Sequence, residues 1–371
     1  MKQIIYADNA ATTKLDIEAF EAMKPYLLDD YSNPSQPYSF SRNSKRAIKE
    51  ARRIIADCIN AEPEEIFFTS GGSESDNWAL KGIVSIATDS KILTSEIEHH
   101  AVLNSCQALS DKGIAISYLK PTKEGVITKS ILKDSLSQDI KLVSIMFVNN
   151  EIGTIQPIKD LCDEAHKIGA LFHTDAVQAV GHLKIDVKEL GVDLLSASAH
   201  KFNGPKGIGF LYIKKGLPIA SFINGGAQEN GYRAGTENVA SIIGMAVALK
   251  NNCDNLEENK RYIQELEQLV LTNIGETTYF RNGGNNLLNG IMSLSFPYVE
   301  GEALLHRLDL MGIMVSTGAA CDSVKTQISH VLAALGLDEE IAKGTIRISL
   351  GKNNTKEEAR QIGLAIKKII G

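Results

Sequence analysis

The hydrophobic pattern of the chain alternates between short apolar runs and longer stretches with helical periodicity. From about residue 65 onward, runs that predict strands are separated by stretches that predict helices. Alternation of this kind indicates a mainly parallel sheet covered by helices. The expected strands are 66–69, 91–94, 115–119, 142–148, 170–173, 192–196 and 208–213, and the expected helices among them are 74–86, 100–112 and 158–168.

The segments on either side of this region have other patterns. Helical periodicity starts near Asp16, and a long amphipathic pattern covers roughly 39–59. The stretch 236–275 is helical and charged, as a connector to a second domain would be. The last hundred residues hold the segments 290–296, 301–310, 312–315, 329–335 and 345–350 and then an amphipathic helix from about Lys356, a pattern that predicts a smaller α+β unit.

Size and composition narrow the class of protein. The chain has 371 residues, which is more than one hydrophobic core usually serves, so we expect two domains. Hydrophobic residues make up 43% and charged residues 23%, as in an ordinary soluble globular protein. The net charge is −6 and no basic block is present, which argues against direct nucleic-acid binding. No apolar run approaches the length of a membrane span, and the first residues do not form a signal peptide.

The cysteines indicate a reducing compartment. Five are present, an odd number, and none forms a Cys-x-x-Cys motif. This pattern argues against a disulfide framework and against a structural zinc site, and favours the cytosol. Cys58, Cys106 and Cys162 fall in amphipathic helical patterns and are expected to pack; Cys253 has no expected role.

Lys201 stands where an apolar run ends in small and polar residues. A Gly/Pro-rich turn follows it, and a second strand-like run, 208–213, closes the unit. Burial lowers the pKa of an amine, and a neutral amine can form a Schiff base with a carbonyl. The alternative is an exposed surface turn with a solvated lysine.

Four other segments carry polar groups at the ends of expected strands. The turn 69–77 contains Gly71-Gly72-Ser73, which could bind a phosphate at a helix start or be a plain turn with Ser73 as N-cap. His99 could lie over a flat ligand or cap a surface helix. Asn150 and Asp175 follow strands at the edge where α/β folds bind ligands. A buried carboxylate at Asp175 needs a partner, which a protonated pyridine nitrogen would supply.

Cys321 lies among small residues in 316–323, where no bulky neighbour would bury it; a buried inert thiol is the alternative. Together, a phosphate turn, an acid for a ring nitrogen and a lysine for an aldehyde are the groups that pyridoxal phosphate requires.

These segments resemble the cysteine desulfurases of the NifS/IscS type, within the class V aminotransferases of fold type I. The resemblance runs almost end to end. It rests on Asp8–Thr13, Ser70–Asn77, Val148–Gly153, His173–Gln178, Ser198–Lys201 with Gly204–Gly207, Gly225–Glu229 and Arg233–Asn238. It implies a large domain, 14–255, with a mainly parallel seven-stranded sheet, and a small α+β domain formed by 1–13 and 256–371 that carries the Cys321 loop.

The resemblance also implies a role for each matching residue. Lys201 would form the Schiff base with pyridoxal 5′-phosphate and move the Cα proton of L-cysteine. Asp175 would pair with the ring nitrogen, and His99 would stack on the ring and assist proton transfer. Cys321 would be the nucleophile. The other implied contacts are Gln178 and Asn150 to the ring, Gly72, Ser73, Ser198 and His200 to the phosphate, Thr236 from the partner subunit of a homodimer, and Asn33, Asn150 and Arg347 to the substrate.

The implied activity converts L-cysteine to L-alanine and leaves sulfur as a persulfide on Cys321. A cytoplasmic acceptor protein, either an iron–sulfur scaffold or a tRNA-thiolation enzyme, would receive the sulfur. No metal is expected. Tyr38 and Ser41 stand where the family usually has histidine and glycine, and Asp322 follows Cys321 where Ser or Thr is common. Three alternatives stay open: a selenocysteine lyase, another class V lyase or aminotransferase, and a non-catalytic paralogue.

Overall fold

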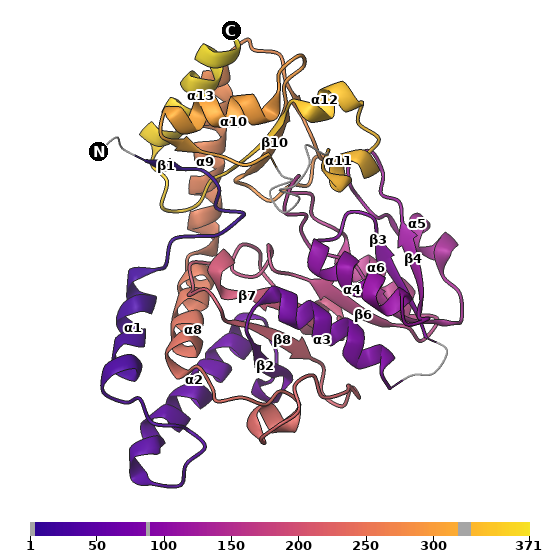
Figure 1. The fold of residues 1–371 in the computed structure, drawn as a ribbon, viewed down its shortest axis with the longest axis vertical. Coiled ribbons are helices and arrows are strands. Elements are labelled where there is room, and N and C mark those ends of the chain that lie inside the picture. The colour runs from indigo at the N-terminus through magenta and orange to yellow at the C-terminus, as the bar shows by residue number, and fades with distance from the viewer. Residues whose placement is uncertain (1–3, 87–89, 318–327) are drawn as a thin grey trace.

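A seven-stranded sheet forms the centre of the computed structural model, which describes residues 4–86, 90–317 and 328–371 (Figure 1). The strand order is β2-β8-β7-β6-β5-β3-β4. Only β8 runs antiparallel to its neighbours in this sheet, so the predicted mainly parallel sheet is confirmed. The strands are β2 (Ile66–Thr69), β3 (Lys91–Ser95), β4 (Ala115–Leu119), β5 (Ile140–Ser144), β6 (Leu171–Asp175), β7 (Leu194–Ser198) and β8 (Gly209–Ile213).

Helices cover both faces of this sheet. Alternate side chains of a strand point to opposite faces, and this alternation separates two cores: Leu194 packs under one face and Leu195 under the other. The first face is covered by α3 (Gly72–Val84) and α4 (His100–Ser110). The helices packed toward the second face are α1 (Ile17–Leu28), α2 (Arg42–Cys58), α5 (Lys129–Ser135), α6 (Ile158–His166) and α8 (Val239–Asp254), with the short α7 (Val187–Leu190) beside them.

One expected strand ends earlier than its apolar run. The run 142–148 is buried throughout, but β5 stops at Ser144. Beyond it the backbone N–H groups of Ile145 and Phe147 donate to the carbonyls of His173 and Asp175 in β6, and the chain then turns back on itself. The expected strand 142–148 was therefore too long, because a fully buried loop and a buried strand have the same apolar pattern.

A second, smaller unit has its own core. Figure 1 shows α9, α10 and α13 gathered at one end of the molecule, away from the large sheet. Its three-stranded sheet has the order β12-β10-β9, and β1 pairs with β11 beside it. The elements are β1 (Ile5–Tyr6), α9 (Leu256–Ile274), β9 (Phe280–Arg281), β10 (Ile291–Ser295), α10 (Gly301–Leu310), β11 (Ile313–Met314), α11 (His330–Ala334), α12 (Glu339–Lys343), β12 (Thr345–Ser349) and α13 (Lys356–Ile370).

The N-terminal segment belongs to the core of the smaller unit, where Ile5 and Ala7 are buried. Helix α8 ends at Asp254 and α9 begins at Leu256. The division of the chain at 255/256 stays a prediction. Among the described residues, no helix is both long and apolar enough to cross a membrane.

Candidate active site

A cavity of about 340 Å³ lies at the carboxyl ends of the parallel strands, and we call it the strand-end cavity. Residues from both units line it, which is where α/β folds place ligands. Most of the predicted site residues meet here, although they come from positions as distant as 72 and 347. Those that line the cavity are Gly72, Ser73, His99, Asn150, Asp175, Gln178, Ser198, His200, Lys201 and Arg347.

Three predicted site residues are not among those lining this cavity. Asn33 lies in the loop after α1, where its side-chain oxygen accepts from the N–H of Ser35. Thr236 is exposed to solvent. Cys321 lies outside the described residues, as does Asp322. The expected roles of Asn33, Thr236 and Cys321 therefore stay predictions.

Lys201 is held at the end of a single 3₁₀ turn directly after β7. Its Nζ donates to the carbonyls of Ala10 and Ala11, the latter at 3.0 Å, and its own carbonyl accepts from His182 at 2.9 Å. The turn is tight, because a Cβ on Gly204 would lie 2.7 Å from the Cβ of Ala199. The amine is thus fixed at the cavity rather than carried on an exposed surface turn.

Asp175 and His99 lie at the same cavity with shifted pKa values. Burial raises the pKa of Asp175, whose Oδ1 accepts from the N–H of Val177 at 2.9 Å. Burial lowers the pKa of His99, which is also the N-cap of α4. Its Nδ1 accepts from the N–H of Ala101 at 3.1 Å, so in the neutral ring the proton is on Nε2. His99 therefore combines the helix-capping role with a place at the cavity.

The expected phosphate turn forms a hollow at the N-terminus of α3 that adjoins the strand-end cavity. Thr12, Ser70, Gly71 and Lys206 line the hollow, together with Gly72, Ser73, Ser198 and His200, which it shares with the cavity. A Cβ on Gly72 would lie 2.6 Å from Cγ2 of Val177, so only glycine fits there without movement. The helix N-cap is Gly71, not Ser73, which leaves the Ser73 side chain available to a ligand.

A carboxylate at this helix start is neutralised by a cation. Glu74 accepts from the N–H of Ser70 at 2.8 Å, and Arg233 donates to it at 2.8 Å. Its negative charge is therefore balanced, and the backbone N–H groups of the turn favour an anion.

These groups fit pyridoxal phosphate. The hollow offers N–H and hydroxyl donors for a phosphate, and Asp175 offers a buried acid without a full counter-charge for a ring nitrogen. Asp76 adds a second buried carboxyl, whose Oδ1 has no hydrogen-bond partner among the described residues. Lys201 supplies an amine, which the fold holds at the same cavity as Asp175.

Arg347 brings a buried cation from the smaller unit into the cavity. It lies on β12 and is 5% exposed. One terminal nitrogen donates to the carboxylate of Asp8 at 2.7 Å, and the other donates to the carbonyl of Asn150 at 2.9 Å. Its Nε is buried and has no hydrogen-bond partner in the described part of the chain. A guanidinium held in this way can bind a substrate carboxylate.

Asn150 and Gln178 line the cavity under local constraints. The buried Asn149 accepts from the N–H groups of Glu151 and Ile152, and this fixes the turn that presents Asn150. Gln178 donates through its Nε2 to the carbonyl of Ala10 at 2.8 Å. The carbonyl of Ala10 therefore accepts from both Gln178 and Lys201.

Sequence analysis missed some of the residues that line the cavity. Asp76 lies four residues after Gly72 in α3, a spacing that places both on one helix face and that could have indicated it. Its pKa is raised by burial and by the neighbouring Asp175. His330 reaches the cavity from α11 and hydrogen-bonds with the carbonyl of Glu98 at 3.0 Å. No local signal predicts that contact, since 232 residues separate the pair.

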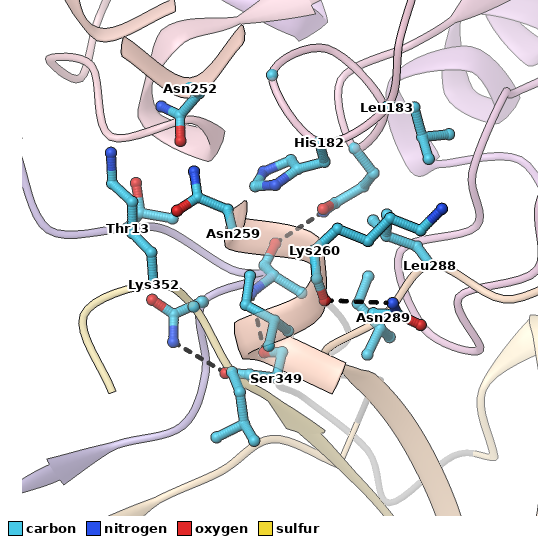
Figure 2. Close-up of a pocket in the computed structure, with 18 of the residues that line it drawn as sticks. Thr13, His182, Leu183, Asn252, Asn259, Lys260, Leu288, Asn289, Ser349 and Lys352 are labelled. Carbon is cyan, nitrogen blue, oxygen red and sulfur yellow. Dashed lines mark hydrogen bonds between the residues drawn. The ribbon is translucent and has the colours of Figure 1, made fainter. Parts of the chain in front are cut away.

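A second cavity, of about 140 Å³, lies behind Ala10 and Gln178 (Figure 2). Its lining includes His182 and Asn252 from the large unit, Asn259 near the start of α9, and Lys352 from the smaller unit. Among its described lining residues are neither carboxylates nor thiols. Its lining residue His182 hydrogen-bonds with the carbonyl of Lys201, so the cavity lies beside the Lys201 segment, but it does not offer the groups that the reaction needs.

Comparisons with known proteins agree with this geometry. Residues 5–362 match the family model described as aminotransferase class-V. A cysteine desulfurase IscS of Dictyoglomus turgidum is 47% identical, over 100% of this chain and 95% of the relative. One of Methanosarcina thermophila is 45% identical, over 99% and 92%.

Solved structures agree as well. A NifS-like protein aligns with a TM-score of 0.94 at 37% identity, over 99% of each chain. The structure titled SspA in complex with cysteine aligns with a TM-score of 0.85 at 36% identity, over 96% of this chain and 100% of the other. The predicted fold type is thereby confirmed. The two relatives named above are cysteine desulfurases, and the chain belongs to the class V aminotransferase family.

Proposed function

We propose that the protein is a cysteine desulfurase that converts L-cysteine to L-alanine with pyridoxal 5′-phosphate and holds the sulfur as a persulfide on Cys321. The observation that carries the proposal is the meeting of Lys201, Asp175, His99 and Arg347 at one cavity. Relatives named cysteine desulfurase, similar over the full chain, support the choice of substrate.

Pyridoxal phosphate, when bound, supplies an aldehyde for amines and a ring that accepts electrons from Cα. Lys201 provides the amine and afterwards accepts and returns the Cα proton at Nζ. Asp175 keeps a proton on the ring nitrogen, because a buried carboxylate is stabilised by a neighbouring positive charge. His99 can donate a proton at Nε2. Arg347 orients the substrate through its carboxylate.

Cys321 completes the proposed reaction. Its thiolate attacks the sulfur of the substrate, so that an S–S bond forms while the Cβ–S bond breaks. The electrons of the broken bond stay with the three-carbon fragment, which takes up protons to become alanine. Asp322, directly after Cys321, places a negative charge beside the thiol and disfavours the thiolate.

A homodimer is the second part of the proposal. Large apolar side chains of α1 and the following loop are exposed, and a partner subunit would cover them. They are Ile17, Phe20, Leu27, Leu28, Tyr31, Tyr38 and Phe40. Thr236 is exposed and absent from the lining of its own subunit's cavity, which fits a contact to the phosphate in the partner.

Mixed dimers test this arrangement. Subunits with Lys201→Ala and with Thr236→Ala each impair a site. If Thr236 acts across the interface, a hybrid dimer contains one site with both residues intact and recovers about half of the wild-type activity per dimer. If a hybrid shown to be dimeric recovers no activity, Thr236 acts either in its own subunit's site or in neither site.

The acceptor of the sulfur is proposed as a protein of iron–sulfur assembly or tRNA thiolation in the cytoplasm. The relatives' name IscS supports the first choice. The four cysteines that the structure describes are free thiols, as a reducing compartment requires.

The test is release of alanine and sulfide from cysteine in the presence of a reductant. Cys321→Ala should keep the visible absorbance of the bound cofactor and lose at least about 10³-fold in activity, as loss of a catalytic nucleophile does. Lys201→Ala should lose the absorbance of the lysine-bound form. Full turnover by Cys321→Ala would exclude the persulfide role. Faster turnover of selenocysteine with Cys321→Ala unaffected would favour a selenocysteine lyase instead.

A further inference from the structure

A layer of buried polar side chains lies next to the strand-end cavity, on the face of the sheet that α3 covers. Its centre is His173 of β6, which is fully buried. Nδ1 of this ring lies 2.8 Å from the hydroxyl of Ser144 on β5, and Nε2 lies 3.0 Å from the hydroxyl of Ser196 on β7. The core beneath the layer is built from apolar side chains. Buried polar groups are costly, so we looked for a function of this layer.

Asp76 completes this layer from the helix side. It lies in α3, is 1% exposed and lines the strand-end cavity. Its Oδ1 lies 3.6 Å from Nε2 of His173 and has no hydrogen-bond partner in the described part of the chain. His173 and Asp175 are two residues apart on β6, so their side chains point to the same face of the sheet, about 6.6 Å apart along the strand. Asp76 therefore lies close to the acid proposed for the ring nitrogen.

The described neighbours of Asp76 supply no cation. Its only ion-pair contact among the described residues is with His173, and burial lowers the pKa of that ring to about 3, so the ring is neutral. The other titratable groups around Asp76 are the carboxyls of Asp175 on β6 and Glu98 before α4. The amine of Lys201, at the same cavity, donates to backbone carbonyls. A carboxylate buried among neutral and acidic groups is costly, whereas a protonated carboxyl is not.

The ring of His173 offers an acceptor for the proton of Asp76. A neutral imidazole donates at one nitrogen and accepts at the other. With the proton on Nδ1, the ring donates to Ser144, and Nε2 is an acceptor that both the Ser196 hydroxyl and the Asp76 carboxyl face. A shift of about 0.5 Å brings the carboxyl within hydrogen-bond length. With the proton on Nε2 instead, the same contact would require a carboxylate at Asp76 without a cation beside it.

We infer that Asp76 is a positioning residue that stays a neutral acid, with His173 as the acceptor of its proton, and that it leaves Asp175 as the single carboxylate for the cofactor ring. The inference rests on the proposed function, because it assigns a role toward the ring nitrogen of pyridoxal phosphate. A second negative charge close to Asp175 would favour a proton on Asp175 itself. Asp175 would then be neutral and would no longer stabilise a protonated ring nitrogen.

Infrared spectroscopy of the cofactor-loaded protein tests the protonation of Asp76. A carbon-13 label on the aspartate carboxyl carbons separates the carbonyl band of a protonated aspartic acid from the bands of glutamic acids and of the cofactor. At pH 7 wild type should show one such band, which should be absent in Asp76→Asn and present in Asp175→Asn. The inference is overturned if wild type lacks the band or if Asp175→Asn loses it. No cysteine is added, so this result does not depend on whether the protein is a desulfurase.

Two substitutions of Asp76 test its positioning role, through the affinity for pyridoxal phosphate and the pH dependence of the visible absorbance of the bound cofactor. Asp76→Asn keeps a neutral donor toward His173 and should keep the affinity within about 2-fold of wild type. Asp76→Leu removes the donor, so it should weaken the affinity about 10-fold and shift the pH profile. The same defect in both variants would show that the charge is needed, and wild-type behaviour of both would show that Asp76 has no such role; either result overturns the inference. The infrared test does not use Asp76→Leu and decides the question if that variant does not fold.

Discussion

Arg347 and Asp8 form an ion pair of 2.7 Å across 339 residues of sequence. The pair connects β12 to the N-terminal segment whose next residues, Ala10 and Ala11, hold the amine of Lys201. The guanidinium is thereby fixed at the strand-end cavity by contacts with the protein alone. The guanidinium proposed to bind the substrate's carboxylate and the amine proposed to move its Cα proton are thus anchored on one short segment.

Replacing Arg347 by lysine tests the substrate-binding role. Lysine keeps the positive charge but cannot make the bidentate hydrogen bonds of a guanidinium to a carboxylate. We therefore expect the KM for cysteine to rise about 10–100-fold with a smaller change in kcat. Steady-state kinetics measures both constants. Arg281→Lys is the matched control, because Arg281 pairs with Glu267 at 2.6 Å and is not among the residues lining the cavity. An unchanged KM in Arg347→Lys would show that the substrate carboxylate binds elsewhere.

The crowding at Gly72 predicts a defect that a second substitution repairs. Gly72→Ala would push its methyl group against Val177, so the cofactor hollow should deform and the affinity for pyridoxal phosphate should fall about 10-fold or more. Titration of the apoprotein with the cofactor, followed by absorbance, gives the affinity.

Gly72→Ala/Val177→Ala removes the crowding atom and is the rescue control. It should recover most of the lost affinity, whereas Val177→Ala alone should have a small effect. Equal loss in the single Gly72 variant and the double variant would mean that the contact with Val177 is not the cause of the lost affinity.

Glu98 should make the protein less stable as the pH rises. Burial raises its pKa to about 8 from an ordinary value of 4.5, against opposing hydrogen bonds from Ser95 and the N–H of Met146. Between these two values the folded state holds a proton that the unfolded state has released. Stability therefore falls through this window by up to about 1.4 kcal/mol per pH unit.

Glu98→Gln resembles the neutral acid and should remove this contribution. The difference in unfolding free energy between pH 5.5 and pH 7.5 should be about 2–3 kcal/mol smaller in the variant than in wild type, as measured by urea unfolding. Glu64→Gln, at an exposed position, should leave the pH dependence unchanged. Identical pH profiles for wild type and Glu98→Gln would mean that Glu98 is ionised in the folded protein.

Much of the fold and of the site could be predicted, because the relevant signals are local. Asp175 and Ser198 end neighbouring parallel strands, so their side chains meet at one edge of the sheet. The contacts of Arg347 with Asp8 and of His330 with Glu98 could not be predicted, since they depend on how the smaller unit docks. The two-residue β1 was missed for a similar reason, because it is a strand only through its pairing with β11. Each of its residues pairs with a residue 308 positions later in the chain.

The hydrophobic pattern also does not predict where a strand ends or how tightly individual residues pack. Nothing in the local sequence indicates that β5 ends at Ser144, because its buried continuation is equally apolar. Glycines at the phosphate hollow allow backbone N–H groups to approach a ligand closely. The structure adds a second reason, the packing of Gly72 on Val177.

The most direct test of the proposed function is the mass of the Cys321 peptide after exposure to cysteine without reductant. We predict a gain of about 32 Da on that peptide, one sulfur atom, with one alanine formed per active site. Lys201→Ala should show neither change. Alanine formed with no sulfur on Cys321, or sulfur gained there by Lys201→Ala without alanine, would contradict the proposal that the amine and the thiol act in one reaction.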